Sequence, residues 1–256
     1  MTSKSRIAVV GGTGLVGRHV VAAVTAADHE PIVIARAHGV DIITGDGLAT
    51  ALRGVDAVID VSNVTTLRRR KAVDFFTAGT RHLLAAGQRA GVRHHVALSI
   101  VGVDRVNSGY YQGKRQQEML VLDGGQPASV LRATQFHEFA GQFLDRMPGP
   151  LAVFPKMLVQ PIAAREVAGA LVALAVAEPV GMAAELAGPQ THQLVDLARR
   201  VVRARGQRRL VVGVRLPGRS GRASATGGLL PTGPGPRGTV TFDEWLSRSE
   251  PTPAFR

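Results

Sequence analysis

Cysteine is absent from the 256-residue chain, and its absence excludes three kinds of chemistry. The protein cannot form a disulfide, bind a metal through thiolates or use a cysteine nucleophile. A chain without disulfides suits a reducing compartment, so we expect a cytoplasmic protein. The first residues agree with this expectation, because their apolar run breaks at glycines and lacks a signal-peptide core.

Long apolar runs are also missing. The longest, Val167 to Ala177, is too short to span a bilayer and predicts a buried helix, so no membrane association is expected. Histidines are few and scattered. His94 and His95 begin an expected strand, where neighbouring side chains point to opposite faces, and no metal site is predicted.

Acidic and aromatic residues are scarce. The formal charge is +12, which is typical of nucleic-acid-binding proteins, but aromatics make up only 4% of the chain and the arginines are scattered. Stacking platforms for single strands are therefore lacking, and no nucleic-acid partner is expected. Lysine is the rarer cation, with four lysines against 27 arginines.

The apolar segments of the first half predict a parallel sheet. Helical segments separate continuous apolar stretches, a pattern typical of a sheet covered on both faces. The expected fold class is α/β, a doubly wound parallel sheet. The predicted strands are 6–10, 31–35, 40–44, 56–61, 94–100 and 128–132, and the predicted helices of this half reach Ala27 and cover about 68–90 and 109–123.

After residue 133 the pattern loosens. We expect one region at 1–133 and a smaller, partly interleaved region at 134–256. The segment 213–238 is rich in Gly, Pro and Arg and predicts a loop. The helices predicted in this region are 136–146, 165–178, 193–205 and 241–246, the last capped by Thr241 or Asp243.

The stretch "VVGGTGLVG" follows the first predicted strand and opens a helix. Glycines at these spacings permit a tight turn, close approach of the backbone to a pyrophosphate, and close packing of helix on strand. The N–H groups of the helix start then face the phosphates. The residues predicted to bind the nucleotide here are Gly11, Gly12, Thr13, Gly14, Leu15, Val16 and Gly17.

The second strand indicates which nucleotide is preferred. An NAD site usually has an acidic residue at the end of this strand, whereas this chain has Arg36, which suits a 2′-phosphate. The sequence therefore favours NADP(H) over NAD(H). Asp46 follows the third predicted strand, where its carboxylate either accepts from the adenine amino group or forms a turn.

Both tyrosines of the chain stand together, four and three residues before Lys114. Residues four apart on a helix share a face, so Tyr110 and Lys114 point the same way. A nearby ammonium lowers the pKa of a phenol from its usual value near 10, which would make Tyr110 a usable proton donor. Tyr111 also lies within reach, so spacing alone leaves open which phenol acts. Ser99 ends the fifth predicted strand, at the edge where open parallel sheets bind ligands.

These motifs together resemble a known family. The stretches "AVVGGTGLVG", "VIDVSN", "VALSIVGVD", "GYYQGK" and "VLRATQF" are similar in order and spacing to the short-chain dehydrogenase/reductase superfamily, and more narrowly to its NmrA-like NAD(P)-binding group. The chain departs from the family pattern at Ala133, where proline is usual. The resemblance implies a Rossmann doubly wound parallel sheet as dinucleotide-binding core (1–133) and a small C-terminal substrate-binding region (134–256). It also implies Ser99, Tyr110 and Lys114 in catalytic positions, with Lys114 on the nicotinamide ribose as well. The residues that it implies along the nucleotide are Val61, Ser62 and Asn63, and those near the substrate are Gln135, Phe136, Phe139 and Tyr111.

The leading hypothesis is an NADP-dependent reductase that transfers hydride to a small carbonyl, imine or quinone. Tyr110 would donate the proton, Lys114 would lower the pKa of Tyr110, and Ser99 would orient the acceptor oxygen. One alternative is a non-catalytic NADP(H)-binding redox sensor, with 213–238 as its partner-binding loop. Another is a nucleotide-sugar epimerase or dehydratase. A monomer or homodimer with a small-molecule substrate is expected.

Overall fold

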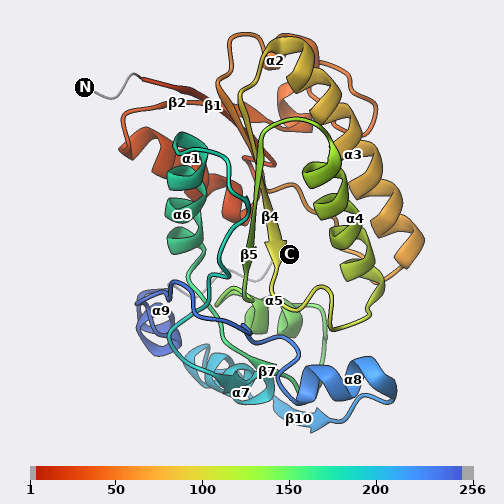
Figure 1. Ribbon diagram of the computed structural model, residues 1–256. Coiled ribbons are helices and arrows are strands. Elements are labelled where there is room, and N and C mark those ends of the chain that lie inside the picture. The colour runs from red at the N-terminus through yellow and green to blue at the C-terminus, as the bar shows by residue number, and fades with distance from the viewer. Residues whose placement is uncertain (1–3, 250–256) are drawn as a thin grey trace.

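The computed structural model describes residues 4–249 and has a six-stranded sheet at its centre (Figure 1). Neighbouring strands all pair in parallel, in the order β2-β1-β3-β4-β5-β8. The sheet is thus of the Rossmann doubly wound type, as predicted. Its strands are β1 (Arg6–Val10), β2 (Glu30–Ile34), β3 (Ala57–Asp60), β4 (His94–Ile100), β5 (Ala128–Ala133) and β8 (Gly181–Met182).

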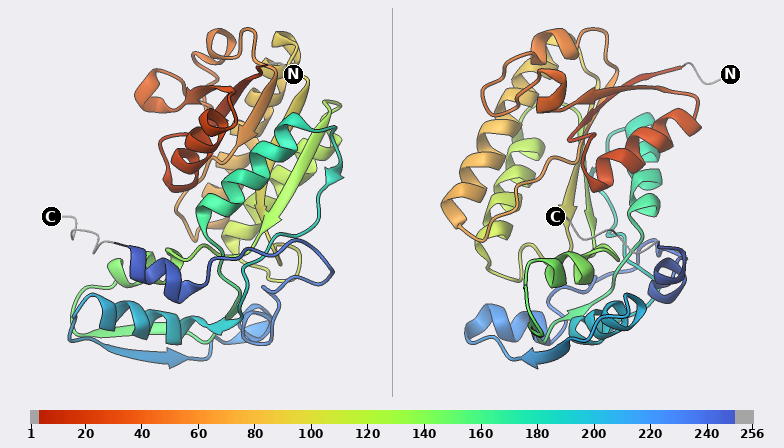
Figure 2. Two further views of the ribbon diagram at one scale, coloured as in Figure 1. Left: turned by 90° about the vertical axis from the view of Figure 1, so that its left-hand side faces the viewer. Right: turned by 180° about the vertical axis from the view of Figure 1, so that it is seen from behind.

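Helices cover both faces of the sheet (Figures 1 and 2). On one face, α1 (Leu15–Ala26) packs against α6 (Ala164–Val176), and their valines, leucines and alanines join the strands in one buried core. On the other face lie α2 (Leu48–Ala51), α3 (Arg69–Ala90) and α4 (Gly109–Asp123). The apolar run at 167–177 is therefore a helix of the core, because its burial against the sheet removes its apolar surface from water.

A smaller region lies below the carboxyl ends of the strands (Figure 1). It has its own core, which includes Phe154, Val201 and Phe242. Between its segments in sequence lie α6, which packs on the central sheet, and β8, which is a strand of that sheet, so the chain passes between the two regions more than once. Its elements are α5 (Phe139–Asp145), β6 (Leu151–Pro155), β7 (Leu158–Val159), β9 (His192–Gln193), α7 (Leu194–Ala204), β10 (Leu210–Val214), α8 (Gly218–Ala225) and α9 (Phe242–Arg248).

The strand predicted at 40–44 is wrong. Asp41 accepts the Ile43 N–H at 2.7 Å through its side chain, and its own N–H is donated to the Asp46 carbonyl at 3.0 Å. An aspartate side chain that bonds nearby backbone groups competes with strand pairing. Val40 and Ile42 still pack into the core, but from a turn that follows the short 3-10 helix η1 (Arg36–His38).

The prediction of a loop over 213–238 is wrong in part. β10 ends inside this segment and α8 forms within it. Glycine supported the loop prediction, but Gly221 permits close packing of α8 instead. A Cβ on this residue would lie 2.2 Å from the Leu216 carbonyl oxygen. Thr241 caps α9 with a complete capping box, as one of the two predicted caps. Within residues 4–249, no helix is long and apolar enough to cross a membrane.

Candidate functional site

The strand order changes direction beside β1. The chain passes from β1 to its neighbour β2 and then crosses to β3 on the other side, so the loops after β1 and β3 lead away from each other. Ligands of open parallel sheets bind in the crevice at such a point. The first residues of the two loops are still close together, as Gly11 shows: a Cβ on this glycine would lie only 3.1 Å from Ser62 Cα.

The glycine turn after β1 has the geometry that the sequence predicts. Gly11 has φ of +78°, and its carbonyl accepts the Gly14 N–H at 2.9 Å. A Cβ on Gly17 would lie 2.1 Å from that same carbonyl oxygen, so only glycine fits. Gly14 is the N-cap of α1 and offers no capping side chain, and no acidic residue stands in the first turn. The helix start therefore suits an anion, and these residues fit a dinucleotide pyrophosphate.

Two further residues predicted to bind the nucleotide lie after β2. Arg36 is the first residue of η1, exposed, and makes no ion pair within residues 4–249. Asp46 is also exposed, and its carboxylate accepts the Thr44 hydroxyl at 2.7 Å. The structure thus uses Asp46 in the turn that replaces the predicted strand.

Tyr110 reaches the loop that follows β3. Its hydroxyl donates to Asn63 Oδ1 at 2.7 Å, which connects the predicted proton donor to the segment beside the glycine turn. Two glycines that the sequence analysis did not single out bring α4 close to α3: a Cβ on Gly109 would lie 2.5 Å from the Leu67 carbonyl oxygen, and one on Gly113 would lie 2.7 Å from Phe76. Ser108 caps α4 by accepting the Tyr111 N–H.

Lys114 lies on the same side of α4 as Tyr110, since both pack against the ring of Phe76. The ammonium is 4.5 Å from that ring centroid, and the Tyr110 ring is 5.9 Å from it. Lys114 is only 4% exposed, and Nζ donates to the Leu98 carbonyl at 2.9 Å and to Gln117 Oε1 at 2.8 Å. The sequence analysis did not predict the next contact, in which Gln117 Nε2 donates to the buried carboxylate of Asp60 at 2.8 Å.

The electrostatics of the pair differ from the prediction. Burial, with a smaller contribution from Tyr111, raises the pKa of Tyr110 above its ordinary value near 10. Burial also lowers the pKa of Lys114 to about 8, opposed by the charges of Asp60 and Glu118. The expectation that Lys114 lowers the pKa of Tyr110 is therefore wrong in this arrangement, because the ammonium is held by Leu98 and Gln117 and desolvation of the phenol dominates.

Ser99 is buried below α4, and its Oγ has no hydrogen-bond partner within residues 4–249. No hydrogen bond joins it to Tyr110 in that part of the chain, so the third predicted catalytic group does not complete a contact with the phenol. Ser99 pairs across the sheet with Arg132, whose guanidinium lies against Glu118 of α4.

The residues predicted near the substrate divide into two groups. Tyr111 lies beside the Gln135 amide. Burial raises the pKa of Tyr111 to about 12, and the nearby amide opposes this rise. Neither polar atom of the amide makes a hydrogen bond of normal geometry within residues 4–249. Phe136 packs on the central core, and Phe139 begins α5 and packs on Phe143 in the smaller region. The structure therefore brings Tyr111 and Gln135 together and leaves the two phenylalanines in packing positions.

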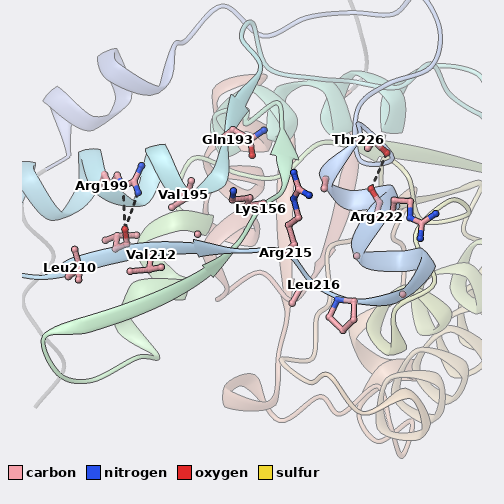
Figure 3. Close-up of a pocket in the computed structure, with 16 residues that line it drawn as sticks. Lys156, Gln193, Val195, Arg199, Leu210, Val212, Arg215, Leu216, Arg222 and Thr226 are labelled. Carbon is pink, nitrogen blue, oxygen red and sulfur yellow. Dashed lines mark hydrogen bonds between the residues drawn. The ribbon is translucent and has the colours of Figure 1, made fainter.

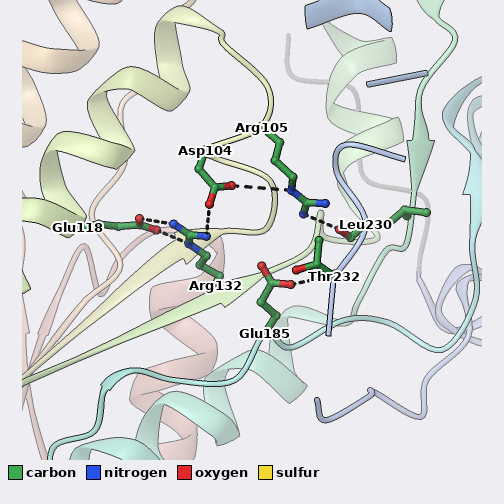
Figure 4. A network of polar contacts seen from close by, with 7 residues as sticks. All are labelled: Asp104, Arg105, Glu118, Arg132, Glu185, Leu230 and Thr232. Atoms are coloured by element: carbon green, nitrogen blue, oxygen red, sulfur yellow. Dashed lines mark hydrogen bonds and ion pairs between the residues drawn. The ribbon is translucent and has the colours of Figure 1, made fainter. Parts of the chain in front are cut away.

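An ionic network supports the loop between β4 and α4 (Figure 4). Arg132 makes a two-pronged contact with Glu118, at 2.8 and 2.7 Å, and reaches Asp104 at 2.9 Å. Arg105 then donates to the Leu230 carbonyl, which ties this loop to the C-terminal part of the chain. These contacts join segments far apart in sequence, and the sequence analysis did not find them.

Comparison with known proteins supports the fold. Residues 7–105 match the model of the NAD dependent epimerase/dehydratase family. Over 146 residues the chain is 34% identical to a (4-alkanoyl-5-oxo-2,5-dihydrofuran-3-yl)methyl phosphate reductase of Streptomyces griseus, which covers 51% of this chain and 48% of the relative. The chain thus spans about half the length of this curated relative.

Solved structures resemble most of the chain in fold. The dTDP-glucose 4,6-dehydratase DesIV of Streptomyces venezuelae, with NAD bound, has a TM-score of 0.70 at 20% identity and covers 95% of both chains. RMD of Pseudomonas aeruginosa, complexed with NADPH, has a TM-score of 0.69 at 18% identity and covers 95% of this chain and 96% of its own. The chain therefore has the Rossmann-type dehydrogenase fold, and its residues 7–105 are similar to the NAD dependent epimerase/dehydratase family.

Proposed function

We propose that this chain is an NAD(P)H-dependent reductase of the short-chain type that acts on a small carbonyl, imine or quinone. The observation that carries the proposal is the position of the Tyr110 hydroxyl, which donates into the 61–63 loop, directly beside the glycine turn. A phenol at the carboxyl edge of a Rossmann sheet is positioned for proton transfer near a bound dinucleotide. The curated relative from Streptomyces griseus, which matches over 146 residues and is named as a reductase of a furanyl-methyl phosphate, also supports the proposal.

The proposed roles follow from the contacts. The cofactor, when bound, supplies the hydride. The N-terminus of α1 and its glycine turn hold the pyrophosphate, Val61, Ser62 and Asn63 line the nucleotide, and exposed Arg36 favours a 2′-phosphate, hence NADP(H). Tyr110 is protonated at neutral pH and would donate that proton to an acceptor oxygen, although burial raises its pKa and makes it a weaker acid than a phenol in water. Ser99, whose hydroxyl has no hydrogen-bond partner among residues 4–249, orients the acceptor together with Tyr111 and Gln135.

Lys114 has a changed role in this proposal. Its ammonium is fixed against Leu98 and Gln117, so it positions α4 and contributes local positive potential instead of contacting the phenol oxygen. A ribose contact by Lys114 would require the side chain to leave these partners. The finer assignment to the NmrA-like group also remains part of this proposal.

An epimerase or dehydratase is the second candidate, since the family model at 7–105 carries that name. Such enzymes return the hydride to their own substrate and keep the cofactor bound. Release of NAD from the purified, denatured protein at one mole per chain would favour this candidate over the reductase.

The test of the reductase is NADPH oxidation across a panel of quinones, ketones and imines, with Tyr110→Phe and Tyr111→Phe as matched variants. We expect turnover that falls by about 10²-fold or more in Tyr110→Phe, the usual contribution of a general acid, with a smaller loss in Tyr111→Phe. NADPH binding without turnover of any acceptor, or equal activity of Tyr110→Phe and the unmodified chain, would overturn the proposal.

A further inference from the structure

A groove runs along one edge of strand β10 in the smaller region (Figure 3). Its volume is about 1060 Å³, and a hollow of about 260 Å³ continues it along the same strand. Residues 210–213, 215 and 216 line the groove, so side chains from both faces of the strand border it. A space bordered by both faces of a strand lies along its edge. No residue of β6 lines either hollow, so the groove follows the edge of β10 that β6 leaves free.

The backbone hydrogen bonds of β10 agree with this position. At one end of the strand the Leu210 N–H donates to the Pro150 carbonyl at 2.7 Å. At the other end the Val214 carbonyl accepts the Lys156 N–H at 2.8 Å. Alternate residues of a strand bond to the same neighbour, so residues 210, 212 and 214 point their backbone groups at β6. Residues 211 and 213 therefore point theirs into the groove.

Gly213 is the open point of this edge. The Val211 carbonyl already accepts from the Arg199 guanidinium, at 3.2 and 3.3 Å. The N–H and carbonyl of Gly213 have no hydrogen-bond partner within residues 4–249. Unpaired backbone groups at the edge of a sheet are a template for an added strand. In antiparallel pairing a single residue of the added strand would bond to both groups of Gly213, without using Val211.

The face of β10 that points away from α7 is apolar. Leu210, Val212 and Val214 alternate onto this face and are 65, 37 and 37% exposed. Leu151 and Val153 of β6 pair with the first two of them and are exposed as well. In Figure 1 β10 lies at the lower margin of the molecule, below α7, so these side chains are turned to solvent. They form an apolar stripe that ends at the free edge.

The opposite face, on the α7 side, is positively charged. Gly213 marks this side, since a Cβ on it would lie 3.4 Å from Val195 of α7 and 3.5 Å from Lys156 Cγ. Lys156, Arg215 and Arg222 line the groove and make no ion pair within the part of the chain that the structure describes, and no acidic residue lines it. In Figure 3 the side chains of Lys156 and Arg215 point into the same space.

We propose that the free edge of β10 binds an extended segment of another protein as a third strand, in which acidic and apolar residues alternate. The acidic side chains lie on the α7 side, beside Lys156 and Arg215, and the apolar side chains continue the stripe of Leu210 and Val212. The two linings are on opposite faces, and a strand presents its side chains to both faces in turn. A second copy of this chain fits the edge poorly, because pairing two β10 strands would bring these cations together.

The test measures binding of capped heptapeptides to the full chain by calorimetry. The probe alternates glutamate and valine, and we expect one mole to bind per chain. The residue opposite Gly213 shares its face in antiparallel pairing, so it is a glutamate whose own backbone groups meet β10. Methylation of the glutamate amide nitrogens should therefore weaken binding by about tenfold or more. Methylation of the valine nitrogens, which point away from β10, should change the affinity by less than about threefold.

Two double variants test the charged face. Lys156→Glu/Arg215→Glu should weaken binding of the alternating peptide by about tenfold or more. The matched control is Arg81→Glu/Arg89→Glu, which makes the same change in charge at two exposed arginines of α3 and should bind as the unmodified chain does. A peptide of the same composition, with all glutamates before all valines, should bind much more weakly because it cannot place the two kinds of side chain on opposite faces.

Four results would overturn the proposal. Equal weakening in both double variants would show attraction to overall charge, and equal binding of the two peptide orders would show that alternation is not recognised. If methylation of the glutamate nitrogens weakened binding no more than methylation of the valine nitrogens, the Gly213 edge would not pair as proposed. A dimer of the full chain that the alternating peptide dissociates, observed by light scattering, would assign the edge to a second copy.

Discussion

Buried Lys114 should make the stability of the protein rise with pH in the alkaline range. Burial lowers the pKa of this ammonium from 10.5 to about 8. Below pH 8 the lysine is charged in both states, and the cost of burying its charge is fully present. Between pH 8 and 10.5 the folded chain has lost this proton whereas the unfolded chain retains it, so the free energy of unfolding increases with pH.

The magnitude follows from the two pKa values. Because a tenfold change in a protonation equilibrium is worth about 1.4 kcal/mol, the difference between a pKa of 10.5 and one of about 8 corresponds to about 3 kcal/mol. Between pH 7 and 9.5 the gain is about 2 kcal/mol. The measurement should stop at pH 9.5, because Tyr110 and Tyr111 have raised folded pKa values and ionise more readily once unfolded, which removes stability above pH 10.

The assay is urea unfolding followed by circular dichroism at pH 7 and 9.5, with Lys114→Met as reference. All other titrating groups contribute to both proteins, so the difference between their pH responses isolates Lys114. Lys71→Met, at an exposed position on α3, should respond as the unmodified chain does. An identical pH response in Lys114→Met and the unmodified chain would refute the reasoning.

Three further predictions concern the turn, the cofactor and the ionic network. Gly17→Ala places a methyl group 2.1 Å from the Gly11 carbonyl oxygen and should weaken NADPH binding by about tenfold or more, measured by fluorescence titration. Unchanged binding would show that the turn can shift to accept the methyl group. Arg36→Glu should weaken NADPH binding by about tenfold while leaving NADH binding within about threefold; equal losses would argue against a 2′-phosphate contact. Arg132→Met leaves Glu118, only 6% exposed, without its guanidinium, and should lower the free energy of unfolding by about 3 kcal/mol in urea. A loss below about 1 kcal/mol would show that Glu118 finds another partner or takes up a proton.

Local patterns were enough to predict most of the sheet and its helices. β4 and α4 begin and end at the predicted residues, 94–100 and 109–123, because each has a clear apolar pattern bounded by turn residues. The glycine turn was predictable for a similar reason, since its spacing depends on contacts within seven residues. Where side chains of polar residues compete with the backbone, as Asp41 does, periodicity alone gave a strand that does not form.

The candidate site was predictable in its residue types but not in its contacts. The four-residue spacing correctly placed Tyr110 and Lys114 on one side of α4. It could not reveal that Lys114 is held by Gln117 and Leu98, or that Gln117 in turn meets Asp60, which is 57 residues away in sequence. These partners are supplied by the packing of α4 on the sheet. Local spacing contains no information about that packing.

This long-range network also bears on the direction of the proposed chemistry. A phenol acts as a base only when ionised, and burial holds the pKa of Tyr110 above 10 while the nearest ammonium is occupied elsewhere. Reduction of a carbonyl requires the opposite, a protonated phenol that donates as charge develops on the acceptor oxygen. In the arrangement seen here the phenol is protonated at neutral pH, but its raised pKa makes it a weak acid, and a lower pKa would first require Lys114 to leave Gln117 and approach the phenol. Gln117→Leu, which removes the side-chain acceptor of the ammonium, should therefore lower the pH at which Tyr110 ionises, measured by phenolate absorbance in a Tyr111→Phe background, where Tyr110 is the only tyrosine of the sequence. An unchanged titration would show that Gln117 serves only the packing of α4.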